Sequence, residues 1–191
     1  PLEMNGSKTI SDRLNILHKV ERIVFNSEWS KKRFLSGMDR IYFKSKKLLV
    51  IYQSTNKVRI NLKKKDKLIT FVGKLNRAKG YDIFGEAIIK ILDKYPDWKS
   101  NVFGDEPREK LFYKHKNLKL MGFKQHGVVL DNFKKSSITV VCSRWQEPFG
   151  RTSLEASSRG CAVIISNRGG LPETVTNAII LKKLNYMTLY K

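Results

Sequence analysis

Short apolar runs alternate with segments of helical spacing from about residue 68 onward. The runs at 68–72, 101–103, 118–121, 138–142 and 162–165 are predicted as strands. Helices are predicted over 81–95, 128–135 and 151–159, with a further charged helix near 106–115, and Pro96 ends the first of them. Short apolar strands separated by helices are typical of a parallel sheet covered on both faces. The pattern predicts an α/β fold with a Rossmann-like, doubly wound parallel sheet.

The first 66 residues follow a different pattern. Helices are predicted over 9–20 and 27–35, with Ser27 as the N-cap of the second, and strands over 22–25 and 48–52. So few strands do not close a core alone, and we expect this part to complete a domain that begins upstream. The polar run 61–66 is interpreted as a linker, which separates region 1–66 from region 67–191. With Pro1 at its start and a further possible helix at 185–191, the chain is interpreted as a fragment.

Charge adds a constraint that the apolar pattern does not contain. The chain has 38 Lys and Arg against 17 Asp and Glu, a formal net charge of +21. Such an excess suits an anionic partner, which includes nucleic acid, an acidic membrane face and a phosphorylated substrate. The basic residues are scattered, with short clusters at 44–47, 63–65 and 182–183, so a solvated basic surface is the simpler alternative. The apolar share of 41% excludes a mainly disordered chain.

Cysteine and histidine positions indicate neither a disulfide framework nor a metal site. Cys142 and Cys161 lie at strand-like positions, which predicts buried free thiols in a reducing, cytoplasmic compartment. His18, His115 and His126 lack ligand spacing and are predicted to be surface or structural residues. A Gly-x-Gly-x-x-Gly motif and a phosphate-binding P-loop are both absent, which disfavours nicotinamide dehydrogenases and P-loop NTPases. No apolar stretch is long enough to span a bilayer.

Candidate chemistry is richest in the segment that follows the fourth predicted strand. Ligands of open parallel sheets bind at the carboxyl ends of the strands. There, Glu147 precedes a turn at Phe149 and Gly150 into the next helix, where unpaired backbone amides favour an anion. Glu155 lies about one turn into that helix and suits two vicinal hydroxyls, such as those of a ribose. The alternative is that both glutamates only cap and solubilise the helix start.

The segment after the first predicted strand supplies positive charge at the same edge. It reads Gly73-Lys-Leu-Asn-Arg-Ala-Lys-Gly80 and places Lys74, Arg77 and Lys79 before a helix. These cations are suited to neutralise a diphosphate and to stabilise it as a leaving group. Taken alone, the segment is equally compatible with a solvated basic loop.

Together these segments resemble glycosyltransferase family 4, whose members have two facing Rossmann-like domains, the GT-B fold. The likeness rests on Gly73-Lys74-Leu75, Lys79-Gly80, the Glu147-Pro-Phe-Gly…Glu155-Ala segment and 166–173, with 25–29 and 50–52 resembling the acceptor-side domain. Three positions depart from the family pattern. Lys74 replaces an arginine, Arg151 replaces an aliphatic residue beside the nucleotide, and Ala178 replaces a glycine.

The resemblance implies a retaining transfer of a hexose from a nucleoside diphosphate sugar to a saccharide or lipid-linked acceptor in glycan or lipopolysaccharide-type biosynthesis, without metal ion or cofactor. Region 67–191 would be the donor-binding domain, truncated at its end, and region 1–66 the remnant of the acceptor-side domain, so the fragment alone is expected to be inactive. Glu147 would act on the sugar and Glu155 would hold the ribose. The other donor contacts would be Gly73, Lys74, Lys79, Met121 (near the base), Phe149, Gly150 and Arg151.

Two further functions remain open on the sequence. The chain can be a basic, non-enzymatic binding module for nucleic acid or an anionic membrane, or a degenerate, purely structural transferase fold. Motifs that interleave aromatic and basic residues for base stacking are absent, so no nucleic-acid partner is expected. A cytoplasmic location is expected, with peripheral contact at the inner, anionic face of the membrane as a hypothesis.

Overall fold

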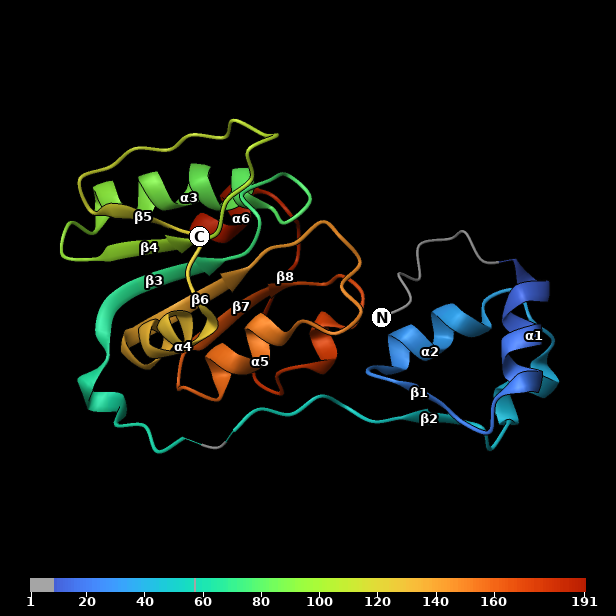
Figure 1. The fold of residues 1–191 in the computed structure, drawn as a ribbon. Coiled ribbons are helices and arrows are strands. Elements are labelled where there is room, and N and C mark those ends of the chain that lie inside the picture. The colour runs from blue at the N-terminus through green and yellow to red at the C-terminus, as the bar shows by residue number, and fades with distance from the viewer. Residues whose placement is uncertain (1–8, 57) are drawn as a thin grey trace. The chain divides into compact units, whose positions relative to one another are not determined.

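The computed structural model describes residues 9–56 and 58–191, which fall into two compact units divided between Ser54 and Thr55 (Figure 1). The division thus falls before the polar run 61–66, which contains a short 3-10 helix, η2 (Leu62–Lys64), within the second unit. Among the described residues, no helix is both long and apolar enough to cross a membrane.

The first unit is a small α/β assembly. The unit contains two parallel strands, β1 (Ile23–Phe25) and β2 (Leu48–Val50). It also contains helices α1 (Ile10–Lys19) and α2 (Glu28–Leu35) and a 3-10 helix, η1 (Arg40–Lys44). Thr9 and Asp12 form a capping box at α1, and the Ser27 hydroxyl accepts the amide of Ser30 at 3.0 Å, which confirms the predicted cap. Its core is formed by Leu17, Phe25, Phe34, Leu35, Met38 and Leu48.

The second unit contains one sheet of six parallel strands in the order β5-β4-β3-β6-β7-β8. Five of them are the strands predicted from the apolar runs. The sixth strand, β8, pairs with β7 at the edge of the sheet and is absent from the prediction. The strands are β3 (Asp66–Val72), β4 (Lys99–Phe103), β5 (Leu118–Gly122), β6 (Ser136–Val141), β7 (Ala162–Ser166) and β8 (Ile179–Leu181). The predicted doubly wound parallel sheet is confirmed.

Helices cover both faces of this sheet (Figure 1). Helices α3 (Tyr81–Lys94) and α6 (Tyr186–Tyr190) pack on one face over a core that includes Phe71, Phe84 and Leu92. On the other face, α4 (His126–Lys135), α5 (Arg151–Ser157) and the 3-10 helix η3 (Leu171–Glu173) cover a core around Phe103 and Phe133. Because both faces are covered, the central strands β6 and β7 read as nearly continuous apolar runs instead of alternating ones.

The charged helix predicted near 106–115 is wrong: residues 104–117 form a loop between β4 and β5. Two carboxylates of this segment bind the neighbouring loop 73–80 instead. Glu106 accepts hydrogen bonds from Asn76 (3.2 Å) and from Arg108 (2.7 and 2.9 Å), and Glu109 accepts the amide of Arg77 at 2.9 Å. The Tyr113 ring packs edge-on against Tyr81 of α3, 5.5 Å between centroids. These contacts hold the segment across α3 without a helix.

Lys65 ties the entry segment of the second unit to two helix ends. Its ammonium group donates to the carbonyls of Phe133 (2.8 Å), Ser136 (2.8 Å) and Arg159 (2.6 Å), at the carboxyl ends of α4 and α5. The negative ends of both helix dipoles favour a cation at this place. Burial lowers the pKa of Lys65 below its ordinary value. A residue of the predicted polar linker is therefore fixed to the second unit.

Candidate functional site

The two loops singled out in the sequence lie side by side because β3 and β6 are neighbours in the sheet. Loop 73–80 follows β3 and loop 142–150 follows β6. The carbonyl of Ala78 accepts the backbone amides of Arg144 (2.9 Å) and Trp145 (3.0 Å) and the Ser143 hydroxyl (3.1 Å). The carboxyl edge of the central strands therefore carries both the basic and the acidic segment.

A partly buried ion pair reinforces this junction. The guanidinium of Arg144 donates to both carboxylate oxygens of Asp82, at 2.5 and 2.7 Å, and to the carbonyl of Arg77 at 2.7 Å. Burial alone would raise the pKa of Asp82, but the hydrogen bonds and charge of Arg144 outweigh it and hold that pKa below its ordinary value. The fork fixes the first turn of α3 against the loop after β6.

Lys79 and Glu147 meet across the junction. The Lys79 ammonium lies 2.6 Å from Oε1 of Glu147, with 33% and 14% of the two side chains exposed. The backbone of Glu147 is held as well, because its carbonyl accepts the amide of Gly170 at 2.7 Å from the turn before η3. The two side chains for which the sequence predicted phosphate and sugar contacts are therefore paired with each other.

The turn that carries Lys79 depends on a glycine. Gly80 is the N-cap of α3 and has a φ of +74°. A Cβ atom at this position would lie 2.0 Å from the carbonyl oxygen of Cys142, at the end of β6. Loop 73–80 therefore approaches β6 too closely for any side chain at residue 80. The amide of Lys79 itself is held by the Asn76 side chain at 2.9 Å.

Glu155 lies on α5, close to the loop that contains Glu147. It is buried, with 9% of its side chain exposed, and its Oε1 lies 2.9 Å from Nη2 of Arg151, the first residue of α5. Gly150 is the N-cap of α5, and the side chain of Phe149 is buried beneath the turn. The Phe149 side chain therefore packs in the protein interior and is not exposed to a ligand.

The remaining predicted residues are spread more widely. Gly73 follows β3 directly, and its amide donates to the Phe103 carbonyl at 3.0 Å. Lys74 follows Gly73 and is exposed. Met121, near the carboxyl end of β5, lines a hollow on the α4 face with Asn101 and Phe103. The proximity of Met121 to the base stays a prediction.

The structure adds one residue that sequence reasoning assigned to a surface or structural role. Nε2 of His126, the first residue of α4, lies 3.1 Å from Oε1 of Glu155. The available signal was its place four residues after the carboxyl end of β5, at the same edge of the sheet as the other candidates. Among residues 9–56 and 58–191, no cluster of His, Cys, Asp or Glu side chains has the arrangement of a metal site.

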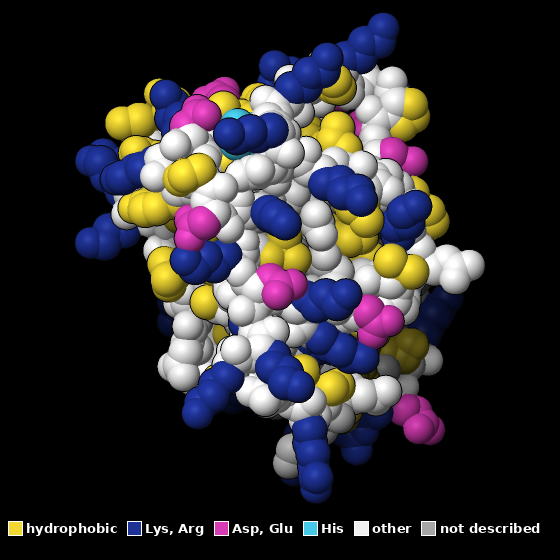
Figure 2. Space-filling view, turned by 90° about the vertical axis from the view of Figure 1, so that its left-hand side faces the viewer, with side chains coloured by type: hydrophobic (Ala, Val, Ile, Leu, Met, Phe, Trp, Pro, Cys, Tyr) yellow, Lys and Arg dark blue, Asp and Glu magenta, His cyan; other side chains and the backbone are white. Residues whose placement is uncertain are grey.

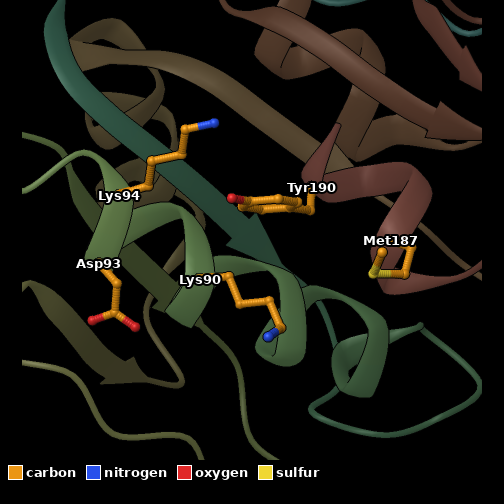
Figure 3. Close-up of a pocket in the computed structure, with 5 residues that line it drawn as sticks. All are labelled: Lys90, Asp93, Lys94, Met187 and Tyr190. Atoms are coloured by element: carbon orange, nitrogen blue, oxygen red, sulfur yellow. The ribbon is translucent and has the colours of Figure 1, made fainter.

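A separate pocket lies between α3 and α6, lined by Lys90, Asp93, Lys94, Met187 and Tyr190 (Figure 3). Lys94 and Tyr190 extend toward one another, with the ammonium 5.6 Å from the ring centroid. Lys94 ends α3, whereas Tyr81 begins that helix at the edge with the two loops, about 20 Å away along the helix axis. The pocket is therefore distinct from the Lys79–Glu147 junction.

Comparison with protein families matches residues 53–184 to the family described as "Glycosyl transferases group 1". The match spans the whole sheet and both loops. The chain belongs to the glycosyl transferases group 1 family. Among curated relatives, spore coat protein SA of Bacillus subtilis is 32% identical over 123 residues, which cover 57% of this chain and 32% of the relative. The chain spans about a third of the length of the curated relatives it matches.

Solved structures of glycosyltransferases share the fold. Alr3699/HepE of Anabaena, determined in complex with UDP, superposes with a TM-score of 0.75 at 19% identity, over 96% of this chain and 57% of that one. The C-terminal domain of the group 1 family protein LpcC from Francisella tularensis gives a TM-score of 0.57 at 27% identity, over 67% of this chain and 74% of that domain. The group 1 chain described here thus has the α/β architecture of GT-B glycosyltransferase structures.

Proposed function

We propose that this group 1 chain is the donor-binding part of a retaining glycosyltransferase, of the family 4 type, that transfers a hexose from a nucleoside diphosphate sugar to a saccharide or lipid-linked acceptor. The observation that carries the proposal is the pairing of Lys79 with Glu147 at 2.6 Å across two adjacent loops, with Glu155 on the helix that follows. A cation and two carboxylates are thereby gathered at the edge of a parallel sheet where ligands bind.

Each charged residue has a role in this proposal. Lys79, with Lys74, neutralises the diphosphate and stabilises it as the bond to the sugar breaks. Glu147 orients the sugar hydroxyls and faces the positive charge that develops on the sugar ring. Glu155 accepts hydrogen bonds from the ribose hydroxyls. Because the lysines carry the charge balance, this scheme needs no cofactor, and the nucleotide sugar enters as a substrate.

Removal of the Glu155 carboxylate is expected to weaken nucleotide binding, whereas removal of an unrelated carboxylate is not. Titration calorimetry of the chain with UDP, GDP and ADP should identify at least one that binds. Glu155→Ala should then raise its Kd about tenfold, because a hydrogen-bonding carboxylate is lost from the site. Glu86→Ala removes an exposed carboxylate of α3 and should leave the Kd unchanged. If no nucleotide binds the unaltered chain, or if both variants behave alike, the donor-site proposal fails.

We also propose that the protein works at the cytoplasmic face of an anionic membrane. Residues 110–130 contain five lysines and no Asp or Glu. Phe112 and Phe123 in this stretch are 65% and 76% exposed, and the Lys114 ammonium lies 5.0 Å from the centroid of the Phe112 ring. Figure 2 shows Lys and Arg side chains interspersed with hydrophobic ones on one face of the molecule. Cationic and exposed aromatic side chains together suit the interface of an anionic bilayer.

Vesicle sedimentation tests the membrane proposal. The chain should bind vesicles that contain anionic phosphatidylglycerol more strongly than vesicles of pure phosphatidylcholine. Added salt should weaken this preference. Changing Lys110, Lys114, Lys116 and Lys119 to Gln should abolish most of the difference. The same change at the exposed Lys63, Lys64, Lys134 and Lys135 removes equal charge and should have a smaller effect. Equal partitioning into both vesicle types would contradict the proposal, and equal effects of the two sets would reassign the surface.

The basic-module alternative predicts other results. A nucleic-acid module would bind DNA with a steep dependence on salt and would be indifferent to changes at Glu147 and Glu155. The pairing of Glu147 with Lys79 and the position of Glu155 on the helix that follows favour the donor site over this alternative.

A further inference from the structure

Two helices hold the carboxylate of Glu155 at once. Its Oε1 lies 2.9 Å from Nη2 of Arg151, one turn earlier on α5, and 3.1 Å from Nε2 of His126 at the start of α4. Only 9% of the Glu155 side chain is exposed, whereas 62% of Arg151 and 58% of His126 are exposed. Two groups at the surface therefore converge on one largely buried oxygen.

These contacts occupy one oxygen of the carboxylate and leave the other. In the described part of the chain, both contacts of the Glu155 carboxylate involve Oε1, and Oε2 takes part in neither. A carboxylate held through one oxygen keeps the second as an acceptor of fixed direction. Such an acceptor suits the neighbouring hydroxyls of a sugar ring.

Helix stability does not explain where the two holding residues stand. His126 and Arg151 are the first residues of α4 and α5, at the positive ends of the helix dipoles, where a cation is unfavourable. Arg151 also precedes Glu155 by four residues, the less favourable order for an ion pair within a helix. Their common feature is the contact with Glu155.

We propose that His126, with Arg151, is a positioning residue of the donor site, which orients Glu155 toward the ribose. This inference rests on the proposed function. The imidazole and the guanidinium hold one oxygen of the carboxylate, so the other oxygen keeps a fixed direction. Without the ring, Glu155 keeps its charge but loses part of this orientation, and donor affinity falls.

The experiment measures the Kd of UDP-glucose, GDP-glucose and ADP-glucose by calorimetry. For the ligand that binds, His126→Ala should raise the Kd about threefold, a modest change because His126 is half exposed. His126→Gln keeps a hydrogen-bond donor at this position and should restore most of the lost affinity.

Two control variants separate positioning from other effects. His115→Ala alters a histidine that contacts Asp93 at the far end of α3, and the Kd should stay unchanged. In a Glu155→Ala background, His126→Ala should have no further effect, since the imidazole acts through that carboxylate. A Kd that is unchanged in His126→Ala overturns this inference while the donor site stands. If none of the three nucleotide sugars binds the unaltered chain, the proposed function itself fails.

Discussion

Lys79→Met is expected to raise the Kd of the nucleoside diphosphate about 100-fold, the largest effect of any single charge in the site. The lysine is two-thirds buried and bonded to Glu147, so its loss removes the main partner of the diphosphate and leaves the Glu147 carboxylate unpaired beside it. The unpaired carboxylate then repels the incoming anion. Lys134→Met, which removes an exposed lysine of α4, is the matched control and should leave the Kd unchanged.

Glu147→Gln should act in the opposite direction on binding. Without the competing carboxylate, Lys79 is free to serve the diphosphate, and the Kd should fall roughly three- to tenfold. The double variant should have a Kd between those of Glu147→Gln and Lys79→Met, because it lacks both the lysine and the carboxylate that repels the anion. Calorimetry on the four proteins gives the coupling directly. A Kd raised to the same extent in both single variants would show that the pair binds the nucleotide as one unit and would contradict this account.

Gly80→Ala is expected to destabilise the second unit by at least about 3 kcal/mol. A left-handed backbone alone costs an alanine about 1–2 kcal/mol, and here the new Cβ would also overlap the Cys142 carbonyl oxygen, 2.0 Å away. That oxygen belongs to the backbone at the end of a central strand, so the chain itself must move. Scanning calorimetry should show the melting temperature of this unit about 10 °C lower.

Two glycines of the same unit serve as controls. Gly122 has a φ of +66°, but a Cβ added there would meet no heavy atom within 4 Å, so Gly122→Ala should cost only the backbone strain of about 1–2 kcal/mol. Gly127 lies in α4 with open space around it, and Gly127→Ala should stabilise the unit by about 0.5–1 kcal/mol. A melting temperature for Gly80→Ala equal to that of Gly122→Ala would refute the role of the close approach.

The sequence predicted the sheet because each strand is a short apolar run closed by a glycine or polar loop. It did not reveal β8, whose three residues Ile179–Leu181 give too little pattern to separate a strand from a buried turn. The helix at 106–115 failed because its carboxylates bond to loop 73–80, a tertiary contact with no local signature. The charge pattern alone therefore gave a wrong prediction, because contacts with residues distant in the sequence determine the conformation of this segment.

The candidate site, too, could be predicted from the sequence only in part. The order of strands and the family resemblance brought Lys79, Glu147 and Glu155 to one edge. The pairing of Lys79 with Glu147 depends on side-chain directions that spacing does not encode. His126 was missed because its partner lies 29 residues later on another helix, and an isolated histidine has no motif.

The adjacency of β3 and β6 has a consequence for how this unit folds and opens. Their loops are separated by about 70 residues in the chain, so the Lys79–Glu147 contact cannot form until the two central strands have paired. Local fraying at β5 or β8 leaves it intact, and only disruption of the sheet centre separates the two side chains. A nucleotide that bridges these loops therefore stabilises the unit against its global opening, and should slow hydrogen exchange most in β3 and β6, far more than at the outer strands.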